Sequence, residues 1–211
     1  MTRKAALVMI CLTVAPILGS AECPPSAFPF DFHLPPHWGV VSCETLGADP
    51  DLWFHPAIRA VPLRFTVEWK KAVERGDLQL FVRVGPTEPS PTAVTYVPSS
   101  LSPPSIEMDR LGDLCNRIEK NMEVSNSLFG GTALLHGCHE VEVSGFPTLY
   151  VEKSNLPNGL WMIEHQVFFS SDILVVLATL CPEGDVQAVR EEVELIVNGL
   201  SPRANDSKSH H

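Results

Sequence analysis

The sequence from Gly131 to Leu200 decides the fold: GTALLHGCHEVEVSGFPTLYVEKSNLPNGLWMIEHQVFFSSDILVVLATLCPEGDVQAVREEVELIVNGL. It contains four hydrophobic segments, separated by short breaks of Gly, Pro, Asn, Ser and Asp, which favour turns. Connections this short join antiparallel neighbours, because a parallel crossover needs roughly a dozen residues. The stretch therefore predicts an antiparallel meander. Its strands are expected at Ala133–Val143, Thr148–Lys153, Leu160–Phe169 and Ile173–Cys181.

An amphipathic helix is predicted to close this stretch over Asp185–Gly199. Asp185 can cap its N-terminus, Gly199 sits where a left-handed cap residue belongs, and Pro202 follows shortly after. Apolar residues recur at three- and four-residue steps and form one stripe, which we expect to pack across the meander. The stripe consists of Val186, Val189, Val193, Ile196, Val197 and Leu200.

The chain before the meander predicts shorter elements. Alternation of apolar residues favours strands at Phe28–Leu34 and Leu63–Trp69, although Val67–Glu74 fits a short helix equally well. A helix over Ile106–Met122 follows a Pro- and Ser-rich linker at Pro86–Pro104. This order of strands and two long helices predicts an α+β layered fold. The other expected elements are a returning strand at Val40–Cys43, a loop at Asp49–Pro62, strands at Leu78–Val84 and Ala93–Val97, and a turn at Asn126–Gly131.

The N-terminus has the parts of a secretory signal peptide. Met1–Ala21 combines two basic residues, an apolar core at Ala5–Leu18 and a small-residue cleavage site. A lipoprotein signal is the alternative, because Cys23 lies close to that site. However, Glu22 stands where lipoprotein signals carry Gly or Ala. We therefore expect a protein that is periplasmic or secreted after cleavage.

The length and composition of the chain indicate how many domains it forms and what net charge it carries. The chain has 211 residues and 45% apolar content, which suits one domain over residues 22–202, followed by a disordered tail at residues 203–211. Cleavage would remove Arg3 and Lys4 and no acidic residue, so the formal charge would move from −10 to −12. This charge disfavours nucleic acid and anionic membranes and suits a basic partner, or serves solubility alone.

The mature chain would keep five cysteines, an odd number. In an oxidising compartment we expect two bridges and one free thiol. Cys23 and Cys43 flank a Pro-rich segment and are the predicted pair. Three pairings stay open among Cys115, Cys138 and Cys181, and no C-x-x-C spacing indicates dithiol redox chemistry.

No motif assigns a chemistry to the chain. The segment His136–Glu140 carries metal-ligand residue types, but on a strand His136 and Cys138 would face one way and His139 the other. A metal site there would need ligands from elsewhere. The G-x-S-x-G elbow and the H-E-x-x-H helix of hydrolases do not occur. The sequence therefore predicts no catalytic, cofactor-binding or metal-binding residue.

Three short motifs stand in order along the chain: Phe32…Leu34-Pro35…Trp38, Val143…Gly145…Pro147 and a Cys181-Pro182 strand end before the last helix. Together with the order of strands, hairpins and helices, they resemble a Mog1/PsbP-like domain of the exported bacterial PsbP-like group, over most of residues 28–201. The resemblance implies an α/β/α sandwich with a mostly antiparallel sheet. It also implies an assembly factor, adaptor or partner-binding protein, since members are mostly non-enzymatic. The five mature cysteines and the long loop at residues 86–104 depart from the common pattern.

The predicted function is that of an exported protein that binds another protein without catalysis, as an envelope assembly factor or adaptor. An immunity protein that neutralises a secreted basic toxin, a carrier of a small hydrophobic ligand and an unrecognised hydrolase are the alternatives. An exposed aromatic or acidic face would favour the protein-binding function. An apolar cavity would favour the carrier, and a cleft that holds His together with Asp or Glu would favour the hydrolase. The candidate contact residues are Trp38, Trp53, Phe54, Glu107, Asp109, Asp113, Glu191 and Glu194.

Overall fold

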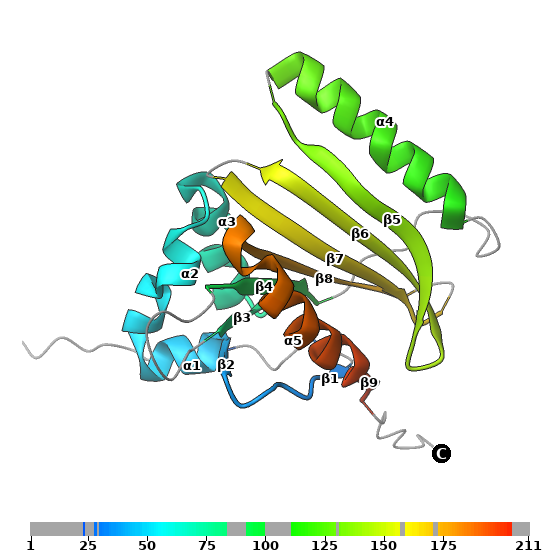
Figure 1. Ribbon diagram of the computed structural model, residues 1–211. Helices are drawn as coiled ribbons and strands as arrows, with labels where there is room; N and C mark the ends of the chain where they lie inside the picture. Colours follow the sequence, from blue (N-terminus) through cyan, green and yellow to red (C-terminus); the bar gives the residue numbers. More distant parts are fainter. Residues whose placement is uncertain are drawn as a thin grey trace, which may run out of the picture.

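A seven-stranded antiparallel sheet organises the protein, and helices cover both of its faces (Figure 1). The computed structural model describes residues 23, 28, 30–83, 92–99, 111–129, 131–156, 159–170 and 173–203. The strands are β2 (Trp38–Val41), β3 (Leu78–Arg83), β4 (Val94–Pro98), β5 (Leu134–Val143), β6 (Phe146–Leu156), β7 (Leu160–Phe168) and β8 (Leu174–Pro182). They lie in the order β2-β3-β4-β8-β7-β6-β5, and all neighbours are antiparallel.

The predicted meander is confirmed, with β5, β6, β7 and β8 as successive neighbours in the sheet. Left-handed backbone at Ser144 (φ 51°) and Gly145 (φ 82°) makes the tight turn between β5 and β6. Phe146 and Pro147 therefore belong to β6. The strands predicted at Leu78–Val84 and Ala93–Val97 correspond to β3 and β4, which continue the sheet beyond β8.

Helix α5 (Val186–Asn198) follows the short turn η4 (Glu183–Asp185) and packs its predicted stripe on one face of the sheet. Both predicted caps differ from expectation. The Asp185 carboxylate accepts a hydrogen bond from the Thr92 N–H (2.8 Å) and none from the helix. Gly199 has φ −84° and is not left-handed. A Cβ on Gly199 would lie 2.8 Å from the Cβ of His33, so close approach requires the glycine.

The opposite face of the sheet carries two groups of helices. The short α2 (Pro56–Arg59) and α3 (Leu63–Glu74) pack on β2, β3 and β4. Helix α4 (Leu111–Phe129) packs on β6, β7 and β8 and runs beside β5 (Figure 1). With α5 on the other face, these helices complete the predicted α/β/α sandwich.

Between β2 and β3 the chain is more helical than the sequence suggested. The expected loop at Asp49–Pro62 contains the 3-10 helix η1 (Pro50–Phe54) and α2. The expected strand at Leu63–Trp69 is wrong, because these residues open α3, whose second part is the alternative helix at Val67–Glu74. Prolines explain both errors, since they stand at the first turns of η1 and α2 and at the N-cap of α3.

Three element ends also differ from expectation. The returning strand β2 stops at Val41, and Cys43 opens helix α1 (Cys43–Ala48). Only Phe30–Asp31 of the predicted N-terminal strand forms β1, which pairs with β9 (Ser201–Pro202) outside the main sheet. The turn expected at Asn126–Gly131 is wrong, because α4 continues to Phe129.

Several predictions lie outside the described residues. They concern the signal peptide, residues 86–91 and 100–104 of the predicted linker, Glu107, Asp109 and the tail beyond Arg203. Within the described part of the chain, no helix combines the length and the apolar character needed to cross a membrane.

Candidate functional site

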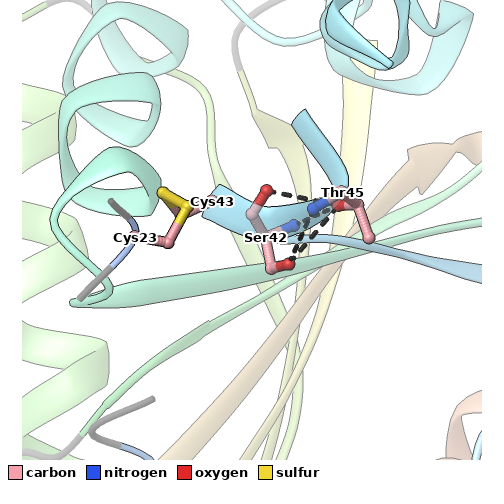
Figure 2. Close-up of a disulfide and its surroundings, with 4 residues drawn as sticks. All are labelled: Cys23, Ser42, Cys43 and Thr45. Atoms are coloured by element: carbon pink, nitrogen blue, oxygen red, sulfur yellow. Dashed lines mark hydrogen bonds between the residues drawn. A yellow bond between two sulfur atoms is a disulfide. The ribbon is translucent and has the colours of Figure 1, made fainter. Parts of the chain in front are cut away.

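A disulfide fixes the N-terminal segment to α1 (Figure 2). Cys23 is joined to Cys43, with their Cα atoms 5.7 Å apart. Beside it, the Ser42 side chain accepts from the Thr45 N–H, and the Thr45 hydroxyl accepts from the Ser42 N–H in return. This capping box starts α1 directly after β2, so the bridge anchors the segment before the sheet to a well-defined helix.

A second disulfide settles the pairing that the sequence left open. Cys115 of α4 is joined to Cys138 of β5, with Cα atoms 5.5 Å apart, and Cys181 stays a buried thiol. Burial, helped by the charge of Asp185, raises the pKa of Cys181 to about 12, so it stays protonated and is a poor nucleophile. Since Cys138 is bonded, it offers no thiolate to a metal. In the part of the chain that the structure describes, no group of three His, Cys, Asp or Glu is arranged to hold a metal ion.

The first candidate surface is apolar and lies on η1 and α3. Four large side chains are exposed there: Phe54 (64%), Leu63 (77%), Phe65 (42%) and Val67 (44%), which we call the apolar face. Phe54 and Leu63 border a hollow of about 760 Å³, which also contacts Trp53 and Ile58 of the neighbouring turns. Leu63 and Phe65 were missed as candidates, because their alternation with Val67 and Trp69 suggested a half-buried strand.

An apolar cavity of about 220 Å³ adjoins this hollow. Val61 and Pro62 line both, so the apolar face continues inward between α3 and the sheet. The ring of Trp69 packs 5.0 Å from that of Tyr96 at its wall. The rest of the lining is also apolar and consists of Phe65, Leu156, Leu160, Met162 and Leu180.

A second candidate site is polar and lies on the other face of the sheet. This polar cavity, of about 430 Å³, is open to solvent and is lined by β5, β6, β7 and the last turns of α5. Its polar lining includes His139, Tyr150, Glu152, His165, Glu194 and Asn198. No motif in the sequence indicates this site, because its residues come from four separate elements.

Glu152 is the centre of the hydrogen bonding around the polar cavity. Although only 7% exposed, its carboxylate accepts from the Tyr150 hydroxyl (2.5 Å), the Trp161 indole N–H (2.8 Å) and Arg190 (2.7 Å). Burial alone would raise the pKa of Glu152, but these donors and the charge of Arg190 outweigh it and lower the pKa. Burial and then the bond to Glu152 raise the pKa of Tyr150 to about 12. Glu152 and Arg190 are therefore both charged, and they form an ion pair in which the two charges cancel.

His165 lies beside this network without joining it. The side chain is 4% exposed, and burial lowers its pKa to about 4, so the imidazole is neutral at neutral pH. Its Nδ1 atom is buried and has no hydrogen-bond partner among the described residues. The ring of Tyr150 lies between the imidazoles of His139 (5.0 Å) and His165 (5.2 Å).

Histidines and an acid in one cleft are what the hydrolase alternative requires, but the geometry does not complete such a site. Glu152 is saturated by three donors and bonds to neither His139 nor His165 in the described structure. No Ser, Thr or Cys is among the described residues that line the cavity. The arrangement can hold a ligand, but it does not pair a nucleophile with a base.

The predicted contact residues do not share one surface. Trp38 is only 6% exposed and donates its indole N–H to Glu192 (2.7 Å), so it is a core residue and offers no contact surface. Trp53 and Phe54 lie at the hollow. The remaining described candidates are Asp113 on α4, Glu191 on α5 and Glu194 on α5 at the polar cavity, all exposed. Because α4 and α5 cover opposite faces of the sheet, these acids form no common acidic face.

Solved structures with a similar arrangement of helices and strands include a Mog1 protein and a PsbP protein, the two proteins after which the resembled domain is named. The Saccharomyces cerevisiae Ran-binding protein Mog1p has a TM-score of 0.47 at 14% identity, covering 82% of this chain and 90% of Mog1p. The cyanobacterial PsbP of Synechocystis has a TM-score of 0.46 at 12% identity, covering 82% and 86%.

LpqN, involved in cell envelope biogenesis of Mycobacterium tuberculosis, has a TM-score of 0.47 at 13% identity and covers 82% of each chain. At these identities the likeness to Mog1/PsbP-like proteins concerns the fold alone. No protein-family model matches the sequence, and no curated protein matches it.

Proposed function

We propose that the chain is an exported, non-enzymatic protein that binds another protein through the apolar face, as an envelope assembly factor or adaptor. The observation that carries this proposal is the exposure of Phe54, Leu63, Phe65 and Val67 within one short stretch. Phe54 and Leu63 border the hollow and Phe65 lines the adjoining apolar cavity, and large apolar side chains that lie close together on a surface mark interaction sites more often than isolated ones do. The partner would cover this face.

The shape of the surface supports a protein partner. Full burial of one such side chain contributes about 1.5–3 kcal/mol, so a few of them can dominate an interface. The hollow beside Phe54 and the apolar cavity beyond it can receive side chains of the partner. The Arg64 guanidinium lies 4.7 Å from the ring centre of Phe65, and Arg59 lines the hollow, so the acids that would steer a basic partner must lie outside this contact.

A basic partner remains the proposal from the overall charge, which would be −12 after cleavage. Within this class, an immunity protein against a basic toxin is the alternative. Long-range attraction raises the association rate and is screened by salt, whereas an apolar contact mainly sets the dissociation rate. If the charge steers binding, association should slow with rising ionic strength while dissociation changes less.

Export is supported by the two disulfides, because such bonds persist in oxidising compartments. The same bonds bear on the lipoprotein alternative. The sulfur of a lipidated cysteine carries a thioether and cannot also form a disulfide, whereas Cys23 is joined to Cys43. Mass spectrometry of the mature protein should therefore find Glu22 as the first residue and no lipid. A diacylated Cys23 at the N-terminus would contradict this assignment.

A carrier of a small hydrophobic ligand is the second candidate function, favoured by the apolar cavity. Its volume of about 220 Å³ lies below the roughly 300–1,000 Å³ of typical ligand pockets. The cavity therefore suits an anchoring side chain better than a lipid. A bound apolar ligand that co-purifies with the protein and is lost in Met162→Trp would favour the carrier.

The test of the proposed function is affinity capture from the native compartment with a matched pair of variants. Phe54→Ser with Leu63→Ser should lose the captured partner, while Leu195→Ser should retain it. Leu195 is 61% exposed and lies on α5, on the opposite face of the sheet. Exposed substitutions usually change stability by less than about 0.5 kcal/mol, so both proteins should stay folded. Equal capture by the two proteins would contradict the proposed contact surface.

A further inference from the structure

The polar cavity is lined by the exposed carboxylates of Glu142 and Glu194 and by the C-terminal end of α5, where the Asn198 carbonyl accepts from the Ser144 hydroxyl (3.0 Å). Val197 and Asn198, in the last turn of α5, line it together with Glu194. A helix ends with negative partial charge, which Lys or Arg in the last turn commonly balances, but α5 has no basic residue there. Among the described residues, Glu194 has neither a hydrogen bond nor an ion pair. This end of the cavity therefore favours a cation.

The inner wall offers acceptors and aromatic faces without adding positive charge. Arg190 is neutralised by Glu152 and does not line the cavity. The imidazole of His165 is neutral at neutral pH, and its buried Nδ1 lacks a partner in the described structure. The ring of Tyr150 lies between the two imidazoles and lines the cavity, and aromatic rings attract organic cations at short range.

We propose that the polar cavity binds an organic cation, with a primary ammonium or guanidinium group seated between Glu194, the C-terminal end of α5 and the ring of Tyr150. Such a group brings several N–H donors and no acceptor, which matches a wall of acceptors. His165, whose buried Nδ1 lacks a hydrogen-bond partner among the described residues, lies on the wall beside it. The volume of about 430 Å³ admits the cation together with a short alkyl chain.

This inference does not rest on the proposed function. The polar cavity lies on the α5 face of the sheet, and the apolar face lies on the α3 face. The cation can come from a free amine or guanidine, or from a Lys or Arg side chain of a protein. Both sources present the same chemistry to the cavity, so the experiment includes one probe of each kind.

The test is calorimetric titration of the full mature chain with n-butylammonium and n-butylguanidinium, and with neutral n-butanol as the matched control. At least one cation should bind at millimolar concentration or below, and butanol should not. Glu194→Gln should weaken cation binding roughly fivefold, the loss of one exposed charge contact. Glu191→Gln, on the same helix and away from the cavity, should bind like the wild type.

A second variant tests the site by adding a positive charge to the wall of the cavity. Asn198→Lys supplies a cation at the helix end, so it should abolish probe binding and raise the melting temperature. The side chain of Asn198 is exposed, so the variant should fold. In histidine ¹⁵N NMR spectra recorded in parallel, the His165 signal should move on titration, and the signal of His55, at the start of α2 on the opposite face of the sheet, should stay in place.

The source of the cation is decided by a short peptide that contains one Lys or Arg. Tighter binding of the peptide than of the butyl probes assigns the site to a basic side chain, and weaker binding assigns it to a free amine or guanidine. Either result supports the cation site. Binding of neither cation, or equal weakening by Glu194→Gln and Glu191→Gln, would overturn it. The variant Phe54→Ser with Leu63→Ser should still bind the probes, which separates this site from the apolar face.

Discussion

Mild acid should destabilise the protein through one buried residue, His165. In the folded protein burial lowers the pKa of this imidazole from 6.5 to about 4. The unfolded chain therefore takes up a proton as the pH falls below about 6.5, while the folded protein does not until about pH 4. A group whose charged form is disfavoured in the fold loses stability over this window as the pH falls. Above it, His165 is neutral in both states and contributes no pH dependence.

The size of the loss follows from the two pKa values. Proton linkage gives roughly 2.5 kcal/mol lost between about pH 7.5 and about pH 4.5, because each tenfold change in proton concentration is worth about 1.4 kcal/mol. The side chain is 4% exposed, so solvent screening reduces this figure little. Glu152 and Glu192, whose pKa values are lowered, add a loss of their own nearer pH 4. The contribution of His165 must therefore be isolated by subtraction.

The assay is urea unfolding at the two pH values, followed by tryptophan fluorescence. In His165→Phe, which keeps a ring of similar size against Tyr150, the pH-dependent loss should be smaller by roughly 2.5 kcal/mol. His139→Phe is the matched control, since His139 lines the same cavity and is exposed. If His165→Phe loses as much stability as the wild type, the reasoning is wrong. An NMR titration midpoint of His165 near 6.5 would refute it independently.

Three further predictions concern stability and oxidation. Glu152→Ala should lower the free energy of unfolding by about 3 kcal/mol, because it leaves the guanidinium of Arg190 half-buried without its carboxylate; urea unfolding at neutral pH measures it. Val193→Asp should prevent folding, because it places a charge at a fully buried position of α5; circular dichroism should show a cooperative melt only for the exposed control Leu195→Asp. Peptide mapping of the mature protein without reductant should find both disulfides and a free thiol only at Cys181, and any second alkylated cysteine would contradict the pairing.

The meander and α5 could be predicted because two signals agreed in each element. The strands combine apolar runs with turn residues at both ends, and the stripe of α5 repeats at helical spacing. Trp161, Ile163 and Val167 alternate along β7, and all three belong to the cluster that packs against α5. Local pattern sufficed there because neighbours in the sequence are also neighbours in the sheet.

The apolar face could not be predicted, because its pattern is ambiguous. Leu63, Phe65 and Val67 alternate as in a strand, yet they belong to α3, where residues two apart point in different directions. A helix that buries Thr66 and Val73 must leave some of these apolar residues outside. The failed strand prediction and the exposed surface thus have one cause.

The polar cavity could not be predicted either, since the strand faces depend on an irregularity in β6. Tyr150 and Glu152 point to the α5 face, and an unbroken alternation would place Leu156 on that face as well. The pairing with β7 shifts between Lys153 and Leu156, and Asn155 takes a left-handed backbone (φ 54°). This bulge turns Leu156 to the opposite face, where it lines the apolar cavity. One strand therefore supplies both candidate sites, a carboxylate to the polar cavity and an apolar side chain to the other.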